Sequence, residues 1–309
     1  MNEFFDKGIE LSNFDIQRYT AIRGKLTGEV FEHRSGRVPQ MYSRVHFCPH
    51  SVTHMDLPWC LSREELKLAQ GSEGVGMITE RPEEIIKLME YYSKICSIDT
   101  VILDLSSKAE IMKTNYLDNK TGCIYQDMNE NDFEKMMQFL EIKRDPDICT
   151  RLSEEEIRGR FLIVKTNWDI EFNLYSFSLD HPFFELRHPY VTYPFLSFET
   201  IKWLVKDLGV AGIGCETSGI ENPIYYTTDH FVPNYASKYL NNLSPKFRPV
   251  SMLLLTNTRY YIKHLTGLSL LKRDEFFVNG KCIGKACIIP ISLGLRDANL
   301  AKVIFFREE

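Results

Sequence analysis

Residues 46–58 read HFCPHSVTHMDLP and hold the densest group of reactive side chains in the chain. Within them His50, His54 and Asp56 follow one another at spacings of four and two residues. Imidazole nitrogen and carboxylate oxygen are ligands that Zn²⁺ and Mn²⁺ accept, and three such groups can converge in a tight loop or along one helical face. Three protein ligands leave positions open for water or substrate, as catalysis requires. The stretch therefore predicts a divalent metal site, with Zn or Mn held by His50, His54 and Asp56.

The alternative for this stretch is a polar loop whose histidines form only local hydrogen bonds. Pro49, Thr53 and Pro58 suit such a loop. An isolated pair of histidines four residues apart would favour it, but the carboxylate two residues later favours a metal.

The segment HSVTHMDLP (50–58) resembles the H-x-G-T-H-x-D-x-P signature of the cyclase family of metal-dependent hydrolases, which includes bacterial kynurenine formamidase and isatin hydrolase. Further segments are similar to other motifs of the family and occur in the family's order. They are VILDLSS (101–107), FLIVKTNWD (161–169), the stretch 188–222 that ends in GIGCETSGIEN, YIKHLTGLSLL (261–271) and the tail 286–305. Each segment is weak alone, and the ordered set carries the resemblance.

The resemblance implies an α/β fold, the swivelling β/β/α domain of the family, in which a mixed sheet has flanking helices. It also implies a homo-oligomer, a dimer or tetramer, in which a neighbouring chain helps to wall the pocket. We expect a single domain over residues 1–309. The charged stretch EIKRDPDICTRLSEEE (141–156) has no counterpart in the family, so we expect an insertion at about 108–160 that forms a solvated excursion.

The matched motifs also imply site residues. His50, His54 and Asp56 coincide with the family's first metal-ligand trio. Cys60 stands where the family has a histidine that acts as a general acid or base, and Met252 and His264 stand where it has the His and Glu of a second metal. Thioether sulfur is a poor ligand for zinc or manganese among oxygen and nitrogen ligands, so we expect one metal.

Two of these residues are candidate catalytic groups with open alternatives. Cys60 could be a thiolate ligand, an activated nucleophile, or a buried, inert thiol beside Trp59. His264 could bind metal, act as a base, or be a histidine that hydrogen-bonds on a helix surface. We assign proton transfer to His264 first and to Cys60 second.

Composition limits the other function classes. The 309 residues have 44% hydrophobic content and a net charge of −5, so the chain lacks the basic charge of a nucleic-acid-binding protein. No apolar run approaches the roughly 20 residues of a membrane helix, and MNEFFDKGIELSNFD has no secretory pattern. The eight scattered cysteines are typical of reduced thiols. We therefore expect a cytoplasmic protein that binds neither nucleic acid nor membrane and acts on a small molecule.

Periodicity and capping residues predict the main elements. The capping box of Ser62 and Glu65 begins a helix at 62–71, and Ser197 caps a helix at 197–208 that Gly209 ends. Other helices are predicted at 82–96, 131–140, 153–158 and 235–243, and strands at 101–105, 161–165, 171–178, 210–215, 251–255, 286–291 and 302–306. Because ligand groups gather where parallel strands end, Glu216, Ser218 and Glu221 should line a pocket.

The predicted metal site and the family resemblance together imply a metal-dependent hydrolase of the arylformamidase type, acting on a small amide, lactam or lactone. Two other hypotheses stay open. One is a binding or regulatory protein that has lost turnover on the same scaffold, and the other is a metabolite cyclase or lyase that uses the same metal.

Overall fold

The computed structural model of the protein describes residues 9–10, 27–33, 40–46, 53–62, 65, 82–116, 129–167, 193–217, 219–222, 248–268, 271, 273–292 and 298–308. His50 and Ser218 lie outside these residues, as do the predicted strand 171–178, the predicted helix 235–243 and most of the predicted helix 62–71. The start of that last helix is visible, because the Glu65 amide donates to Ser62 Oγ and the Ser62 amide donates to Glu65. The predicted capping box is thus confirmed.

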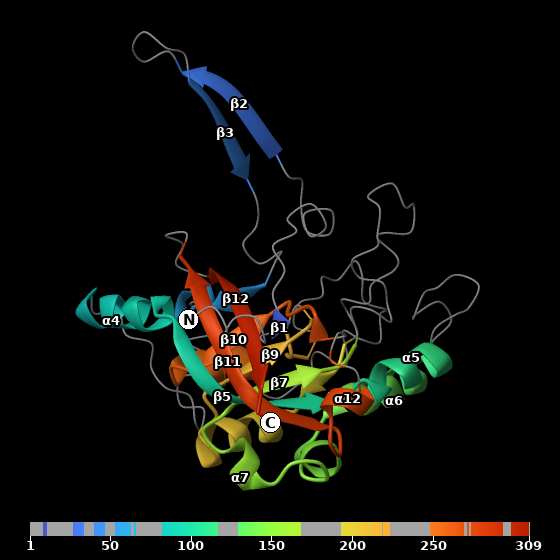
Figure 1. Cartoon of the computed structure of the whole chain (residues 1–309). Coiled ribbons are helices and arrows are strands. Elements are labelled where there is room, and N and C mark those ends of the chain that lie inside the picture. Colours follow the sequence, from blue (N-terminus) through green and yellow to red (C-terminus); the bar gives the residue numbers. More distant parts are fainter. Residues whose placement is uncertain are drawn as a thin grey trace.

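A mixed sheet that closes on itself forms the centre of the fold (Figure 1). Its strands are β1 (Ile9–Glu10), β4 (His54–Asp56), β5 (Cys96–Asp104), β7 (Phe161–Lys165), β9 (Gly212–Cys215), β10 (Tyr260–Lys263), β11 (Lys281–Ile291) and β12 (Ala298–Arg307). The order is β1-β12-β11-β5-β7-β9-β10-β4, and β4 also pairs with β12, which completes a ring of strands. β5, β7, β9 and β10 run parallel, so their carboxyl ends meet on one side.

Two smaller pairs of strands lie outside the ring. β2 (Thr27–His33) and β3 (Gln40–His46) are antiparallel, whereas β6 (Glu141–Ile142) and β8 (Phe195–Leu196) are parallel.

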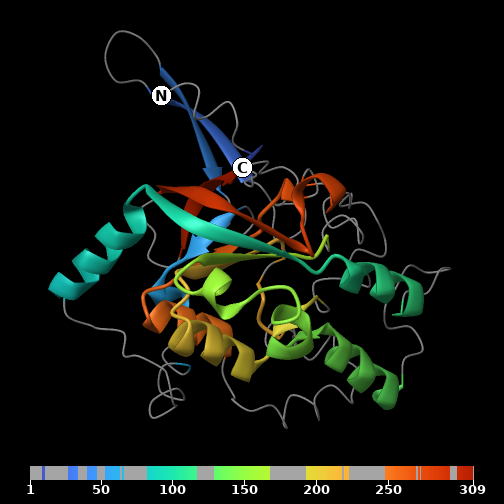
Figure 2. The same ribbon diagram turned by 60° about the horizontal axis from the view of Figure 1, so that its bottom comes forward.

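The helices at 198–202 and 249–256 cover the outer face of the parallel strands (Figure 2), whereas the helix at 82–93 contacts β11. The α-helices are α4 (Pro82–Ser93), α5 (Ser107–Tyr116), α6 (Glu130–Leu140), α7 (Glu154–Ile157), α9 (Phe198–Lys202), α11 (Pro249–Thr256) and α12 (Arg273–Phe276). The described residues also form a 3₁₀ helix, η2 (Pro58–Cys60), and two π-helical turns, η3 (Arg144–Ile148) and η4 (Trp203–Asp207). None of the helices in the described part of the chain is long and apolar enough to cross a bilayer.

Alternation along the strands divides the core into two clusters. In β7, Leu162 and Val164 face the helices, while Phe161 and Ile163 face the inside of the ring. All five residues of this strand are buried, as expected for a parallel strand that is covered on both faces. The predicted α/β class with a mixed sheet and flanking helices is confirmed, whereas a single domain stays a prediction.

Most elements follow the predicted pattern, with one clear error. The predicted strand at 251–255 is wrong, because residues 249–256 form α11. Pro249 stands at the start of this helix, where its missing N–H costs nothing. All residues from Pro249 to Leu255 are buried, so the apolar run had no polar face from which to read a helical period.

The predicted helix at 197–208 begins as expected, since Ser197 Oγ accepts from the Thr200 amide. It widens from Trp203 into η4, where the Leu208 amide donates to the Trp203 carbonyl five residues earlier.

The charged stretch 141–156 is only partly a solvated excursion. Ile142, Ile148 and Leu152 are buried and belong to the core cluster on the helical side of the sheet. The prediction followed the charges and missed these apolar residues between them. That the region 108–160 is an insertion stays a prediction.

Candidate functional site

β4 places His54 and Asp56 on the same face of a strand. Side chains alternate along a strand, so Met55 points into the core inside the ring while its two neighbours point the other way. β4 pairs with β10 on one side and with β12 on the other. His54 and Asp56 are each 1% exposed, so the strand holds two polar side chains in a buried position.

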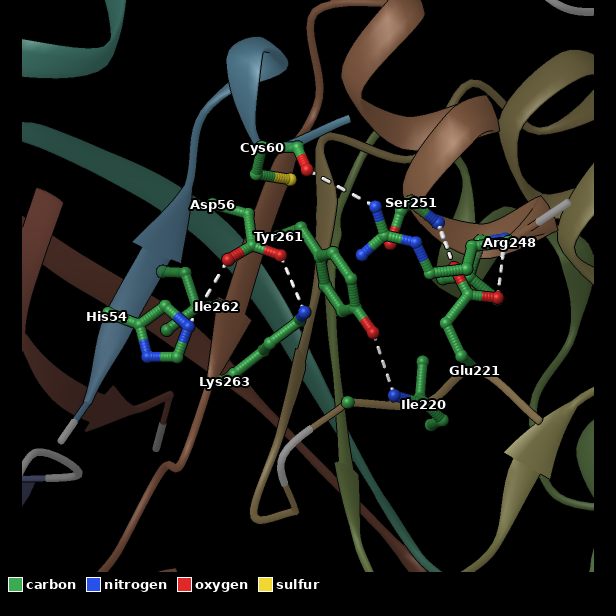
Figure 3. Close-up of polar contacts among 12 residues, drawn as sticks. His54, Asp56, Cys60, Ile220, Glu221, Arg248, Ser251, Tyr261, Ile262 and Lys263 are labelled. Carbon is green, nitrogen blue, oxygen red and sulfur yellow. Dashed lines mark hydrogen bonds and ion pairs between the residues drawn. The ribbon is translucent and has the colours of Figure 1, made fainter. Parts of the chain in front are cut away.

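The donor atoms of these two residues converge (Figure 3). His54 Nε2 and Asp56 Oδ1 are 3.2 Å apart. Two ligand atoms at about 2.0 Å from one tetrahedral Zn²⁺ lie roughly 3.3 Å from each other. The separation therefore fits two ligands of one cation.

Lys263 approaches the same carboxylate from its other oxygen. Its Nζ lies 2.6 Å from Asp56 Oδ2, and the side chain is almost fully buried. Lys263 ends β10 directly opposite His54 in the antiparallel register. Its ammonium also lies 4.5 Å from the centre of the Tyr261 ring, a cation–π distance.

His264 follows β10 and is fixed by its main chain. Its amide donates to the Thr217 carbonyl at 3.1 Å, and its carbonyl accepts from Thr53 Oγ1 at 2.5 Å. Its φ is +55°, in the left-handed region that costs a non-glycine residue about 1 kcal/mol or more. The alternative of a histidine on a helix surface is wrong, because His264 is 5% exposed and directly follows strand β10.

This backbone brings the His264 ring beside the ring of His54. The two ring centres are 5.6 Å apart and the planes are tilted by 41°. Strained backbone of this kind persists where surrounding contacts hold it in place, and it is frequent at functional sites. His264 is thus placed beside the predicted metal ligands.

Cys60 lies above the Asp56 carboxylate at the end of η2 (Figure 3). Burial, together with the negative charge of Asp56, raises the pKa of the Cys60 thiol well above its ordinary value. The sulfur therefore keeps its proton, which favours the inert-thiol alternative. Met252 is fully buried in the core on the helical side of the sheet, as an apolar side chain there should be.

A second buried charge cluster lies at the carboxyl ends of β5, β7 and β9. Lys165 Nζ is 3.6 Å from Asp104 Oδ1. Glu216 Oε2 accepts from the Thr166 amide at 2.6 Å and from the Asn167 amide at 2.7 Å. Burial raises the pKa of the Glu216 carboxyl, and Lys165 opposes part of that effect. Glu216 therefore ties the end of β9 to the end of β7.

Glu221 has a similar role at the start of α11. Its two oxygens accept from the Val250 amide at 3.1 Å and the Ser251 amide at 2.5 Å, so a carboxylate caps the positive end of the helix dipole (Figure 3). Burial raises the pKa of this carboxyl. Glu216 and Glu221, predicted to line a pocket, are thus both buried and bound to main-chain amides.

The described residues do not form a metal site by themselves. Among them, and so without His50, no group of three or more His, Cys, Asp or Glu side chains is arranged to hold a metal ion. His54 and Asp56 are two of the three predicted ligands, and their donor atoms converge. The third, His50, lies outside the described residues.

Comparison with known proteins identifies the family. The Cyclase family model, described as "Putative cyclase", matches residues 8–222, which is more than half of the chain. The chain belongs to the Cyclase family. The family predicted from the ordered motifs is thus confirmed. None of the curated proteins matches this chain.

Several solved structures share this fold. Isatin hydrolase A from Ralstonia solanacearum is 13% identical, with a TM-score of 0.53 over 97% of this chain and 92% of that one. Isatin hydrolase A from Labrenzia aggregata, bound to benzyl benzoate, is 13% identical, with a TM-score of 0.50 over 97% and 94%. A structure described as a novel cyclase is also 13% identical, with a TM-score of 0.53 over 97% and 88%. Identities this low show a shared fold.

Sequence reasoning missed three charged residues of these clusters, Asp104, Lys165 and Lys263. Each follows a run of apolar residues at the end of a buried strand: VIL before Asp104, FLIV before Lys165 and YYI before Lys263. A charge at such a position is a usable signal, because a buried charge needs a partner.

Proposed function

We propose that the protein is a metal-dependent hydrolase of a small amide, lactam or lactone, of the arylformamidase type. The metal is a divalent cation, Zn or Mn, and its ligands are His50, His54 and Asp56. The observation that carries this proposal is the 3.2 Å separation of His54 Nε2 and Asp56 Oδ1 in a buried position. Membership of the Cyclase family supports it, and so does a fold shared with two isatin hydrolases.

When bound, a divalent cation would make a water molecule acidic enough to ionise near neutral pH and would polarise an acyl carbonyl. The side chains of the protein provide the ligand atoms and hold them in place. Asp56 supplies a carboxylate oxygen and His54 an imidazole nitrogen, both held by the pairing of β4 with β10 and β12. Their burial keeps bulk water away, which strengthens every electrostatic contact in the site.

His264 is the group we assign to proton transfer. Its ring lies 5.6 Å from that of His54, and its main chain is fixed by Thr53 and Thr217. An imidazole can take a proton from water and give it to a leaving nitrogen or oxygen near neutral pH. Cys60 is a weaker choice, because its raised pKa keeps the proton on Sγ.

A second candidate is a binding protein on the same scaffold that does not turn over. The contact of Lys263 with Asp56 favours it, because an ammonium already neutralises the carboxylate that a cation would use. Cys60 in place of the family's catalytic histidine favours it as well. Only the hydrolase would convert a substrate to product.

The test measures turnover of formyl-anilide and lactam substrates with added zinc or manganese. We expect hydrolysis by the wild type, and a loss of at least 100-fold in His54→Ala and in Asp56→Asn. Asp99→Asn is the matched control, since Asp99 is an exposed carboxylate on β5, and this variant should keep full activity. Unchanged activity in His54→Ala would exclude the proposed mechanism, and metal binding without turnover would favour the binding protein.

We also propose that the protein is a homo-oligomer. Ile86 and Ile95 are 56% and 67% exposed on and just after α4, and Tyr91 is 36% exposed on the same helix. Apolar side chains of this kind are typical of surfaces that another chain covers. Light scattering coupled to size-exclusion chromatography would reveal a monomer if this proposal were wrong.

A further inference from the structure

Lys263 is a buried charged residue that has no role in the reaction proposed above. It is 5% exposed and ends β10, in a strand whose other residues are apolar or aromatic. Removing an ammonium group from water costs several kcal/mol unless a close partner compensates it. Asp56 is that partner, at 2.6 Å.

The two oxygens of Asp56 face different partners (Figure 3). Oδ1 lies beside His54 Nε2, and Oδ2 lies beside Lys263 Nζ. The ion pair therefore fixes the rotation of the carboxylate, because Oδ1 must point toward His54 while Oδ2 is held. Lys263 in turn is held in register, since it pairs with His54 across the two strands.

This arrangement makes the ammonium and a divalent cation competitors for one carboxylate. A cation beside Oδ1 and the Lys263 charge beside Oδ2 would repel each other across a buried group, where screening by water is weak. The ammonium also occupies the side of Asp56 from which a second cation would bind.

We propose that Lys263 is a positioning residue that orients Asp56 and takes the place of a second cation, so that the site binds a single divalent ion with reduced affinity. This inference rests on the proposed function, since it concerns the cation that function requires. The ammonium of Lys263 contacts the Asp56 carboxylate and the ring of Tyr261.

The test is calorimetric titration of the purified full-length protein with Zn²⁺. Lys263→Met removes the charge and keeps the apolar stem, so we expect zinc to bind at least tenfold more tightly, about 1.4 kcal/mol. Lys263→Gln keeps a donor for Asp56 Oδ2 without the charge and should also bind more tightly. Lys263→Arg keeps the charge and should match the wild type. Every variant should bind one equivalent.

Lys108→Met is the matched control. Lys108 is also buried, at 8% exposed, and its Nζ lies 3.2 Å from an Asp147 oxygen in a different part of the fold. If lost charge acts only by loosening the structure, Lys108→Met would change zinc affinity as much as Lys263→Met does. We expect it to change affinity less than threefold.

The outcomes separate this inference from the proposed function. Two equivalents of zinc in the wild type, or equal or weaker binding by both Lys263→Met and Lys263→Gln, would overturn the role of Lys263. The same holds if no variant binds zinc. Tighter binding by these variants, together with no turnover by the wild type, would support the role of Lys263 and refute the hydrolase. If Lys263→Met does not fold, as judged by circular dichroism, Lys263→Gln decides.

Discussion

Substitution of Glu216 tests how the ends of the parallel strands are joined beneath the site. Glu216 is 1% exposed, and its Oε2 accepts from the amides of Thr166 and Asn167 and from Thr166 Oγ1. Replacement by alanine removes all three hydrogen bonds. Two main-chain N–H groups then lose their acceptor, at about 1–3 kcal/mol each.

Part of this loss is offset, because the variant no longer buries a carboxylate. We expect Glu216→Ala to lower the free energy of unfolding by about 3 kcal/mol. Glu216→Gln keeps an oxygen for the same donors and has about the same shape, so it should cost less than Glu216→Ala, about 1 kcal/mol. The decisive result is that Glu216→Ala lowers the free energy of unfolding more than Glu216→Gln does, whatever the two values are.

Urea denaturation followed by circular dichroism measures both losses, provided that the slope m stays constant. Glu134 is an exposed glutamate on α6, and Glu134→Ala should change the free energy of unfolding by less than about 0.5 kcal/mol. A Glu216→Ala variant within 1 kcal/mol of the wild type would refute the role assigned to Glu216, and so would a Gln variant as unstable as the Ala variant.

The pH dependence of the free energy of unfolding is an independent test of the pKa of the Glu216 carboxyl. Its pKa is raised from the ordinary 4.5, chiefly by burial, so the folded state holds the proton more tightly than the unfolded state does. Wild-type stability from this group is therefore complete below pH 4.5 and declines as the pH rises through the folded pKa. Glu216→Gln cannot ionise, so its deficit relative to the wild type should shrink as the pH rises. A deficit that grew instead would show that the pKa is lowered.

Three further substitutions test the surrounding framework. Tyr261→Phe leaves the buried Ile220 amide without its acceptor at 2.8 Å and should cost about 1–2 kcal/mol in urea denaturation; an unchanged midpoint would contradict this. Gly212→Ala would place a Cβ 2.3 Å from the Tyr260 carbonyl oxygen, so we expect mostly insoluble protein, and a soluble variant of normal stability would refute the strand register. Glu221→Gln should lose the stability decline above pH 4.5 that its raised pKa gives the wild type, and an unaltered pH profile would contradict that assignment.

Local sequence signals predicted those parts of the fold that local physics determines. The strand 161–165 was predicted with the bounds of β7, because a short run of branched and aromatic residues follows a capped turn. The N-cap Ser197 was found from residue type and spacing, and its side chain accepts from the Thr200 amide. The pair His54 and Asp56 was found from residue type and motif spacing, whereas the loop or helical face expected around it was wrong, because these residues form strand β4.

Features set by tertiary contacts were not predictable in this way. α11 was read as a strand, because its seven buried residues carry no polar face. Lys263 was missed, because its contact with Asp56 depends on the pairing of β10 with β4. These two strands are separated by about 200 residues in the sequence. The position of His264 depends on Thr53 and Thr217, which meet it only after the ring of strands has closed.

The charges retained in the site argue for a working site, because stability alone does not explain them. Replacing a buried ion pair by well-packed apolar residues is often neutral or stabilising by about 1–4 kcal/mol. His54, Asp56 and Lys263 nevertheless stand together at no more than 5% exposure, on strands whose neighbouring residues are apolar. His264 adds a strained backbone at φ +55° in the same place. A scaffold that only had to fold would lose little or nothing if apolar residues replaced the whole ion pair. Their joint presence is accounted for if Asp56 must stay charged and oriented, which is what binding a cation requires and what Lys263 provides before the cation arrives.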